Sequence, residues 1–460
     1  MKRHIFHTAA LMTLALTLGG CATLRTPYVT PSVSEAPRWR QASTNVQASG
    51  QAWWRRFGDP QLDRLVDRAL ARNNDLAVTA INLRRAQLQM RDAVINPTIG
   101  ASVTTGSTVA LRGTAASSRT QSAALLASYE IDLFGALAAQ KDSATWEARA
   151  TAQDLESARL SLIATTVDDY FLVGYLNDRI TKSQQSVAYA QRALDLVSVQ
   201  ARAGSASSLE VAEARRNLSS QQAGLHDLLQ QRVEARNALD LLLNGETVAT
   251  TDELQRLPEG PLPNVDAGLP ANLLARRPDL RATELRLRKQ LADLDRTRLS
   301  FYPALSLTGS AGSVSTTLAN LMQHPVGTFG TNIVLPFLQY DQVRLAVGVS
   351  RANYEIATVQ FRQTLYQALT DVENALSARE QLGAQGVAQE QSLVSARTVE
   401  RLDEIRYRAG SIPLQIWLDA QETRRQAENS LQQNRLNQFE NYVTLCKTLG
   451  GDTAVPRKGT

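Results

Sequence analysis

The chain has 460 residues, of which 43% are hydrophobic, 5% aromatic and 20% charged. The 49 Lys and Arg residues against 44 Asp and Glu leave a formal charge of +5, and no run of five like charges occurs, so no feature favours nucleic acid as a partner. Two cysteines exclude a disulfide framework. Beyond residue 20, no apolar stretch is long enough to cross a bilayer as a helix.

The first 20 residues have the parts of a secretory signal. A positive start, an apolar run over residues 5–18 and two glycines precede Cys21. This order is similar to a bacterial lipobox, in which the cysteine is acylated. Ala22 stands in place of the aspartate that retains such proteins in the inner membrane, so the resemblance implies an acyl anchor in the outer membrane. We expect a signal peptide at 1–20 and a lipidated tether at 21–59; the alternative is an ordinary signal with a coincidental cysteine.

Short motifs recur along the chain at one spacing. Arg-Ala-Gly-Ser at 202–205 recurs at 408–411 (408 − 202 = 206), and the prolines before two strand-like runs, Pro97 and Pro303, have the same offset. Five prolines cluster between residues 258 and 278, which indicates a linker. The sequence therefore predicts an internal duplication, in which one structural unit occurs twice. We expect a first repeat at 60–257, a proline-rich linker at 258–278, a second repeat at 279–451 and a tail at 452–460.

Each repeat is predicted to contain the same elements in the same order. In the first repeat these are a helix at 60–95, strands at 98–112 and 120–134, a long helix at 137–202 and a return helix at 208–243. In the second they are a helix at 279–300, strands at 303–314 and 326–338, a long helix at 341–408 and a return helix at 412–449. At 1.5 Å per residue the long helices span about 100 Å. Their thin, alanine-rich stripes with heptad spacing favour helices packed side by side in a curved wall over a globular core.

The strand-like runs alternate between apolar and polar residues. In 120–134, Tyr129 and Ile131 share one parity, while Glu130 and Asp132 have the other. This pattern is typical of a water-filled membrane barrel, in which we expect Glu130 and Asp132 to face the lumen, although a sandwich edge gives a similar signal. Four strands cannot close a barrel in lipid, so several chains must share one. Two chains give eight strands and three give twelve, and the arithmetic does not choose between them.

Several segments carry a family resemblance. They are Trp-Trp-Arg-Arg-Phe-Gly-Asp-Pro-Gln-Leu at 53–62, Tyr-Glu-Ile-Asp-Leu-Phe-Gly at 129–135, Gly-Pro-Leu-Pro at 260–263, Leu-Leu-Ala-Arg-Arg-Pro-Asp-Leu-Arg at 273–281 and Tyr-Pro-Ala-Leu-Ser-Leu-Thr-Gly-Ser at 302–310. With these segments the chain resembles a TolC-family outer-membrane factor of the lipoprotein (NodT-like) branch, which serves RND-type efflux pumps. The resemblance implies an α fold with a membrane β part. Three chains would share a twelve-stranded β-barrel and form an α-helical barrel that extends into the periplasm, with the linker in an equatorial region.

The helix-to-helix turns are the first candidate sites. Gly204 and Gly410 are suited to end the long helices, and Arg202 and Arg408 complement the helix dipoles. The dipole alone explains both arginines. The resemblance implies that the turns are the periplasmic tips that meet the adaptor. The expected contact residues are Arg202, Gly204, Ser205, Arg408, Gly410 and Ser411.

The second candidate site is a gate just past the second turn. The resemblance implies that Tyr407 and Asp419 lie at the constriction of the tunnel, where three copies of the aspartate would form a carboxylate ring that favours cations. Gln415 replaces a frequent apolar ring residue and Glu422 replaces a common arginine, which makes the ring more acidic unless Arg424 and Arg425 compensate. Solvated helix charges are the alternative interpretation.

No constellation of residues suggests an enzyme. Beyond the signal only two isolated histidines remain, so we expect no metal site and no catalysis, and no cofactor other than the lipid on Cys21. We expect a passive exit duct for small molecules such as drugs in the outer membrane. Its partners would be two further copies of the chain, a periplasmic adaptor, an RND-type pump and outer-membrane lipid. The alternatives are a type I secretion channel and a non-conducting coiled-coil lipoprotein.

Overall fold

The computed structural model describes residues 24–32, 52–109, 118–249, 252–265, 276–323 and 325–451. Cys21 and the predicted signal peptide lie outside these residues. The chain divides into two compact units. The sheet unit comprises Met1–Val33, Ile81–Gln153 and Arg281–Thr364, and the helical unit comprises Ser34–Ala80, Asp154–Leu280 and Leu365–Thr460.

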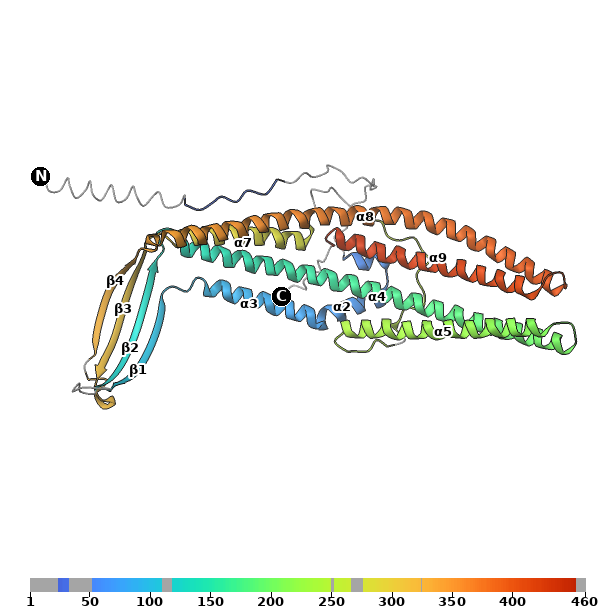
Figure 1. Ribbon diagram of the computed structural model, residues 1–460, viewed down its shortest axis with the longest axis horizontal. Helices are drawn as coiled ribbons and strands as arrows, with labels where there is room; N and C mark the ends of the chain where they lie inside the picture. Colours follow the sequence, from blue (N-terminus) through green and yellow to red (C-terminus); the bar gives the residue numbers. More distant parts are fainter. Residues whose placement is uncertain are drawn as a thin grey trace. The chain divides into compact units, whose positions relative to one another are not determined.

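The predicted order of elements is present in both repeats (Figure 1). After a short 3₁₀ helix, η2 (Trp53–Phe57), the first repeat contains α2 (Pro60–Arg72), α3 (Asn74–Asp92), β1 (Thr98–Thr108), β2 (Ser118–Ile131), α4 (Ala136–Arg202) and α5 (Ser208–Leu242). The second contains α7 (Pro278–Leu299), β3 (Ala304–Ser315), β4 (Val326–Val334), α8 (Tyr340–Arg408) and α9 (Leu414–Thr448). Among the described residues, no helix is at once long and apolar enough for a bilayer crossing.

The predicted helix at 60–95 is wrong in one respect, because the structure divides it at Asn73. The backbone of Asn73 is extended, and its side-chain oxygen accepts a hydrogen bond from the amide of Leu76 at 3.0 Å, as an N-cap does for a new helix. Its side-chain amide also donates to the carbonyl of Leu242 at 3.2 Å. One capping residue inside a continuous helical pattern therefore ends α2 and starts α3.

The four strands form one antiparallel sheet in the order β1-β2-β3-β4. Paired residues share a face of the sheet. The register joins Ile99 to Ala127, Tyr129 to Leu307 and Leu305 to Ile333, which assembles one apolar face. Ser, Thr and Gly dominate the opposite face, which also holds Glu130. The predicted alternation is thus present, and Ile99 and Phe329 on the apolar face are 77% and 92% exposed within one chain.

The ends of the strands differ from the prediction. β2 ends at Ile131, so Asp132 lies outside the sheet, and its carboxylate accepts hydrogen bonds from the amides of Leu137 (3.2 Å) and Ala138 (2.8 Å). The predicted strand to residue 134 is therefore too long, and the Asp132 carboxylate caps the start of α4. β4 ends before Pro336, which cannot donate to a ladder.

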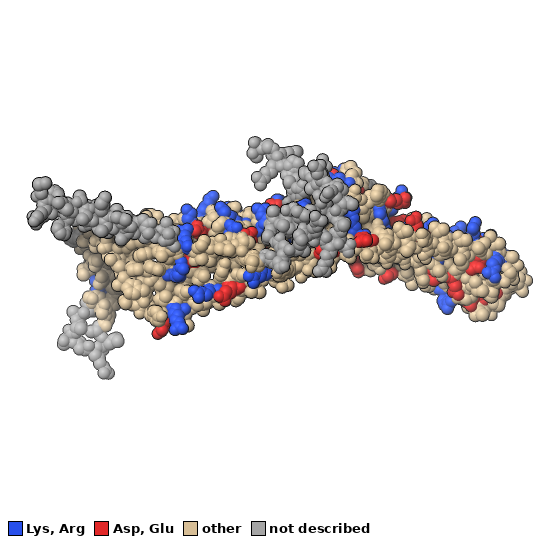
Figure 2. All heavy atoms as spheres, turned by 90° about the horizontal axis from the view of Figure 1, so that it is seen from above, with Lys and Arg blue, Asp and Glu red and all other residues tan. Residues whose placement is uncertain are grey.

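Charge is distributed unevenly along the chain. The four strands together contain only Arg119 and Glu130 as charged residues. On the face drawn in Figure 2, the Lys, Arg, Asp and Glu side chains mark the helices, and the strand end carries few of them. A nearly uncharged sheet with one apolar face is what contact with hydrocarbon requires.

Aromatic residues concentrate in one core of the helical unit. Phe171 of α4 lies 4.4 Å from Phe439 of α9 and 4.9 Å from Phe57, measured between ring centroids. Trp53 and Trp54 are buried in the same cluster. Cys446 is buried there too, and burial raises the pKa of its thiol to about 12. The Trp-Trp-Arg-Arg-Phe motif thus supplies core packing.

The Arg-Arg-Pro-Asp motif joins the first residues of α7 to α8 and α9 within the helical unit. The Arg277 guanidinium bonds the Asp279 carboxylate at 2.7 Å and the carbonyl of Thr448, near the end of α9, at 3.4 Å, and it lies 3.6 Å from Asp371 of α8. Burial acts to raise the pKa of Asp279, but the hydrogen bonds and charge of Arg277 bring it below its usual value. Pro278 is the first residue of α7, where a missing amide hydrogen costs nothing.

Candidate functional site: the helical tips and the seam above them

The two turns between long and return helices have the same backbone. Gly204 and Gly410 have φ values of +75° and +71°, which a residue with a Cβ rarely adopts. The amide and hydroxyl of Ser205 both donate to the carbonyl of Gln200, at 2.9 and 3.0 Å. Ser411 bonds the carbonyl of Arg406 in the same way, at 2.9 and 2.8 Å. Each turn closes the last carbonyls of its long helix.

The six predicted adaptor-contact residues are all exposed. They are Arg202, Gly204, Ser205, Arg408, Gly410 and Ser411. Arg408 pairs with Glu404 one helical turn earlier at 2.6 Å. Three of these residues lie together at each turn, where a partner protein can reach them.

Tyr407 does not project freely from the second turn. It is 8% exposed, its ring stacks on Trp417 at 5.2 Å and an interplanar angle of 20°, and its hydroxyl donates to the side chain of Gln200 at 3.0 Å. Tyr189 of α4 meets the edge of Trp417 at 6.1 Å. We call Tyr189, Tyr407 and Trp417, with the apolar residues around them, the tip cluster. It joins α4, α5, α8 and α9 within one chain.

The other three predicted gate residues lie along one stripe of α9. The amide of Gln415 donates to the carboxylate of Asp419 at 2.7 Å, and Asp419 is exposed. Glu422 forms an ion pair with Arg425 and accepts from the amide of Gln426 at 2.9 Å. Arg425 pairs with Glu422, whose side chain remains 41% exposed. The predicted gate residues thus include two accessible acid groups, and Asp419 is the one of the two without an ion pair to Arg425.

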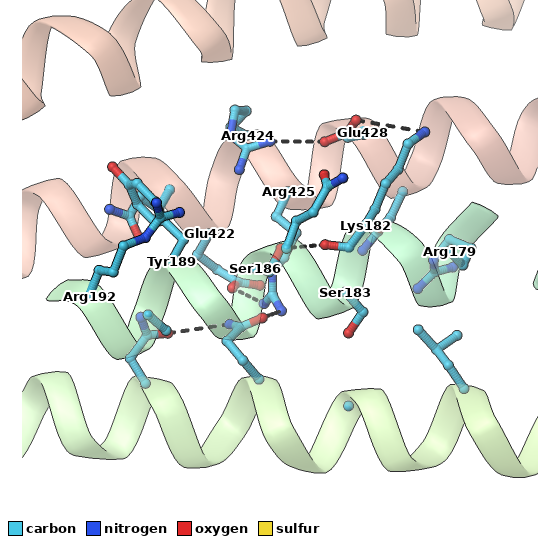
Figure 3. A pocket seen from close by; sticks show the side chains of 18 residues that line it. Arg179, Lys182, Ser183, Ser186, Tyr189, Arg192, Glu422, Arg424, Arg425 and Glu428 are labelled. Carbon is cyan, nitrogen blue, oxygen red and sulfur yellow. Dashed lines mark hydrogen bonds and ion pairs between the residues drawn. The ribbon is translucent and has the colours of Figure 1, made fainter. Parts of the chain in front are cut away.

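A polar cavity of about 510 Å³ lies between α4, α5 and α9, farther from the turns (Figure 3). Arg179, Lys182 and Arg192 of α4 line it, with Arg424 and Arg425 of α9. Hydroxyl and amide side chains supply most of the remaining lining. The seam between packed helices is normally filled with apolar side chains. In this stretch polar side chains take their place, and polar contacts join the helices.

Those contacts join the two hairpins at successive levels. Glu428 of α9 receives Arg424 of its own helix at 2.9 Å, Lys182 of α4 at 3.8 Å and Arg397 of α8 at 3.7 Å. Arg424 also pairs with Glu400 of α8 at 2.6 Å. Further contacts run from Gln432 to Asp178 (2.7 Å), from Tyr175 to Gln433 (2.7 Å) and from Arg425 to Gln221. One carboxylate with three cations from three helices fixes the relative position of these helices.

Burial dominates the electrostatics of this region. Burial, followed by the charges of Glu404 and Glu400, raises the pKa of Tyr189 to about 12. Burial also raises the pKa of Glu400, against the opposing effect of Arg424. Nearer the aromatic core, burial and the charges of Glu440 and Asp169 raise the pKa of Asp168 to about 8. Within the described ranges, no group of three or more His, Cys, Asp or Glu side chains is arranged to hold a metal ion.

Sequence reasoning did not find Trp417, Gln200 or Glu428. Trp417 lies three residues after the buried Leu414 in the apolar stripe of α9. This spacing predicts that Trp417 is buried but does not predict which residues it contacts. The side chain of Gln200 is bonded by a residue of another helix, and two of the three cations at Glu428 lie in other helices. Helical spacing carries no information about contacts between helices so far apart in sequence.

A family model described as "Outer membrane efflux protein" matches residues 65–245 and 269–451. The chain is 32% identical to the pyoverdine export outer membrane protein OpmQ of Pseudomonas aeruginosa, with 98% of both chains covered. It is 29% identical to the toluene efflux pump outer membrane protein TtgC of Pseudomonas putida, with 96% of both chains covered.

Solved structures have the same fold. The open state of the Neisseria gonorrhoeae MtrE outer membrane channel matches with a TM-score of 0.76 and 28% identity, over 93% of this chain and 98% of that one. The Campylobacter jejuni CmeC outer membrane channel matches with a TM-score of 0.82 and 23% identity, over 93% and 94%.

Proposed function

Since the chain belongs to the outer membrane efflux protein family, we propose that it is the outer-membrane exit duct of a tripartite efflux system and conducts small molecules passively from periplasm to exterior. Family members are trimeric outer-membrane channels of such systems. The observation that carries the proposal is the four-stranded sheet, with one apolar face, one polar face and unpaired edges at β1 and β4.

Closure of the sheet by several copies follows from the open edges of the four described strands, and the family supplies the count of three. In hydrocarbon, unpaired backbone groups cost several kcal/mol each, so β1 of one copy must pair with β4 of the next until the sheet closes. Three copies give 4 × 3 = 12 strands. The polar faces then line the lumen, and the apolar faces meet lipid.

The tips of the two hairpins are proposed to bind a periplasmic adaptor, through which an RND-type pump delivers substrate. A photo-reactive residue at Ser205 or Ser411 is expected to capture the adaptor in cells. The same residue at Gln222, exposed on α5 about four turns away, serves as the control. Capture at Gln222 alone, or no capture at the tips, would contradict the assignment. Capture of a type I secretion adaptor would favour the alternative pathway.

The gate is proposed to consist of the stripe of Gln415, Asp419 and Glu422 together with the tip cluster that holds Tyr407. Three copies of the exposed Asp419 carboxylate would form the ring that favours cations. The contacts of Glu428 and the tip cluster hold the closed packing. Adaptor contact at the tips is proposed to bias these helices toward a second packing.

We propose no catalytic role and no cofactor for the duct. OpmQ and TtgC are named for the export of pyoverdine and of toluene, so small organic molecules are the proposed cargo class, selected by the pump. The anchor is proposed to be an acyl group on Cys21 in the outer membrane. Palmitate labelling of the wild-type chain, and its loss in Cys21→Ser, tests this anchor directly.

A further inference from the structure

The apolar face of the sheet changes in polarity along its length. We call it the lipid face, because the proposed barrel turns it toward the membrane. Every second residue of β2 belongs to it. Counted away from α4, these residues are Ile131, Tyr129, Ala127, Leu125, Ala123, Gln121 and Arg119. The lipid face of β2 thus begins with five hydrophobic residues and ends with two polar ones.

The neighbouring strands have polar residues at the same level as the end of β2. Gln121 is paired with Thr105 of β1 and with Ser315 of β3. Arg119 is paired with Ser107 of β1. Paired residues of adjacent strands lie side by side on one face, with their Cβ atoms about 5 Å apart. These five residues therefore form one continuous patch at the end of the sheet farthest from α4 (Figure 1), and we call them the polar band.

The hydrophobic part of the lipid face has the length of a membrane crossing. On β2 it covers nine residues, from Ile131 to Ala123 (131 − 123 + 1 = 9). A tilted strand crosses the hydrocarbon core in about 9–11 residues. At the helix end of this part, the ring centroids of Phe134 and Tyr302 lie 4.8 Å apart, and aromatic rings gather where hydrocarbon meets water. Since the proposed duct extends its helices into the periplasm, the polar band lies at the opposite surface of the membrane, in the outer leaflet.

The polar band carries a positive charge without a carboxylate beside it. Arg119 is exposed. The other charged residue of the four strands, Glu130, is eleven residues away (130 − 119 = 11) and lies on the opposite face. The hydroxyls of Ser107 and Thr105 and the amide of Gln121 add hydrogen-bond donors to the same patch. A guanidinium accompanied by neutral donors matches the oxygens of a phosphate group.

We propose that the polar band binds the phosphate groups of lipid in the outer leaflet, with Arg119 as the charged contact. The acyl chains of the same lipid pack on the hydrophobic part of the lipid face, so that one molecule engages both parts. Charge-assisted hydrogen bonds of this kind are about twice as strong as neutral ones. The inference rests on the proposed barrel, because only a sheet closed within the outer membrane turns the lipid face to lipid.

The first measurement locates the polar band relative to the hydrocarbon. The trimer is purified from outer membranes and reconstituted into phosphatidylcholine vesicles whose acyl chains carry bromine, a contact quencher of fluorescence. A fluorescent label at Ala123 is expected to be quenched at least threefold more strongly than a label at Ser107. A label at Ser122, which faces the other side of the sheet, is the control and should be quenched as little as that at Ser107. Equal quenching at Ala123 and Ser107 would overturn the placement of the band.

The second measurement determines lipid binding to the same trimer. Native mass spectrometry with lipid A, a phosphorylated lipid, should show at least fivefold weaker binding to Arg119→Gln than to the wild-type chain. The matched variant Arg119→Thr with Thr120→Arg keeps the net charge but moves the guanidinium to the opposite face. It is expected to bind lipid A as weakly as Arg119→Gln. Dephosphorylated lipid A should bind all three chains equally.

Three results would overturn the inference. They are equal binding of lipid A to wild type and Arg119→Gln, wild-type binding by the variant with the moved charge, and a loss of the same size with dephosphorylated lipid A. Single-channel recording of the wild-type trimer separates this inference from the proposed duct. A conducting trimer with any of the three results keeps the duct and loses the polar band. Phosphate-dependent binding through Arg119 in a trimer that never conducts would support the band and contradict the duct.

Discussion

The turn between α4 and α5 and the turn between α8 and α9 share their backbone but not their side chains. The first is followed by a complete capping box, in which Ser207 and Glu210 satisfy each other's backbone amides. In the second, Pro413 stands at the N-cap without a side-chain hydrogen bond. The second hairpin instead supplies Tyr407 and Trp417 to the tip cluster.

The two copies of the duplicated unit thus keep the same turn but stabilise it with different side chains. The glycine-dependent turn is common to both tips because only that backbone reverses the chain at this point. Both tips pack into the tip cluster, to which the first contributes Val197 and Ala214. The first tip has a side-chain cap in addition. The second has none and supplies Tyr407 and Trp417, and it is the one next to the proposed gate.

The largest expected effect comes from removing the packing of the second tip. Trp417→Ala deletes a side chain that is 2% exposed and should cost about 3–5 kcal/mol. The equivalent position of the first repeat is Val211 (417 − 206 = 211), which is half-buried, and Val211→Ala should cost about 1 kcal/mol. Thermal unfolding of both variants in detergent measures the difference. Equal losses would refute the asymmetry between the tips.

A second comparison concerns Asp168, whose counterpart in the second repeat is Asn374 (168 + 206 = 374). Burial, then the charges of Glu440 and Asp169, raise the pKa of Asp168 to about 8, with Lys447 opposing. The folded chain therefore binds this proton more tightly than the unfolded chain. The resulting stability is complete below the usual carboxyl pKa and is lost as the pH rises through about 8.

Asp168→Asn should consequently stabilise the protein at pH 9 by about 1–2 kcal/mol and change little at pH 4. Unfolding temperatures measured from pH 4 to pH 9 give the slope for wild type and variant. If the unfolding temperatures of wild type and variant differ by the same amount at every pH, Asp168 does not have the raised pKa.

The smallest effect is expected at the cap of the first tip. Ser207→Ala removes the hydroxyl that accepts from the amide of Glu210 at 3.2 Å and should cost about 1 kcal/mol. Pro413→Ala removes no capping bond and serves as the matched change. Hydrogen exchange in the first turn of α5 should accelerate in the former variant, while the first turn of α9 stays unchanged in the latter. Unchanged exchange in α5 would show that the Ser207 cap does not stabilise the first turn of this helix.

The sequence predicted the order of elements because helical and strand periodicities are local and recur at one offset. The missed break at Asn73 shows the limit of that approach, since a single cap interrupts an otherwise continuous pattern. Asp132 kept the strand alternation but belongs to the cap of α4. Tyr407 was predicted at the gate by resemblance, whereas its hydroxyl donates to Gln200, which is 207 residues away in sequence. Such contacts are set by helix packing, which periodicity does not encode.

Single-channel recording in planar bilayers shows whether the protein is a conducting duct. The purified trimer is expected to form discrete, cation-preferring channels. Asp419→Asn should then reduce the cation preference without loss of insertion, because the exposed carboxylate of the proposed ring is neutralised. Correctly folded, inserted protein that never conducts would contradict the duct, and unchanged cation preference in Asp419→Asn would contradict the assignment of Asp419 to the gate.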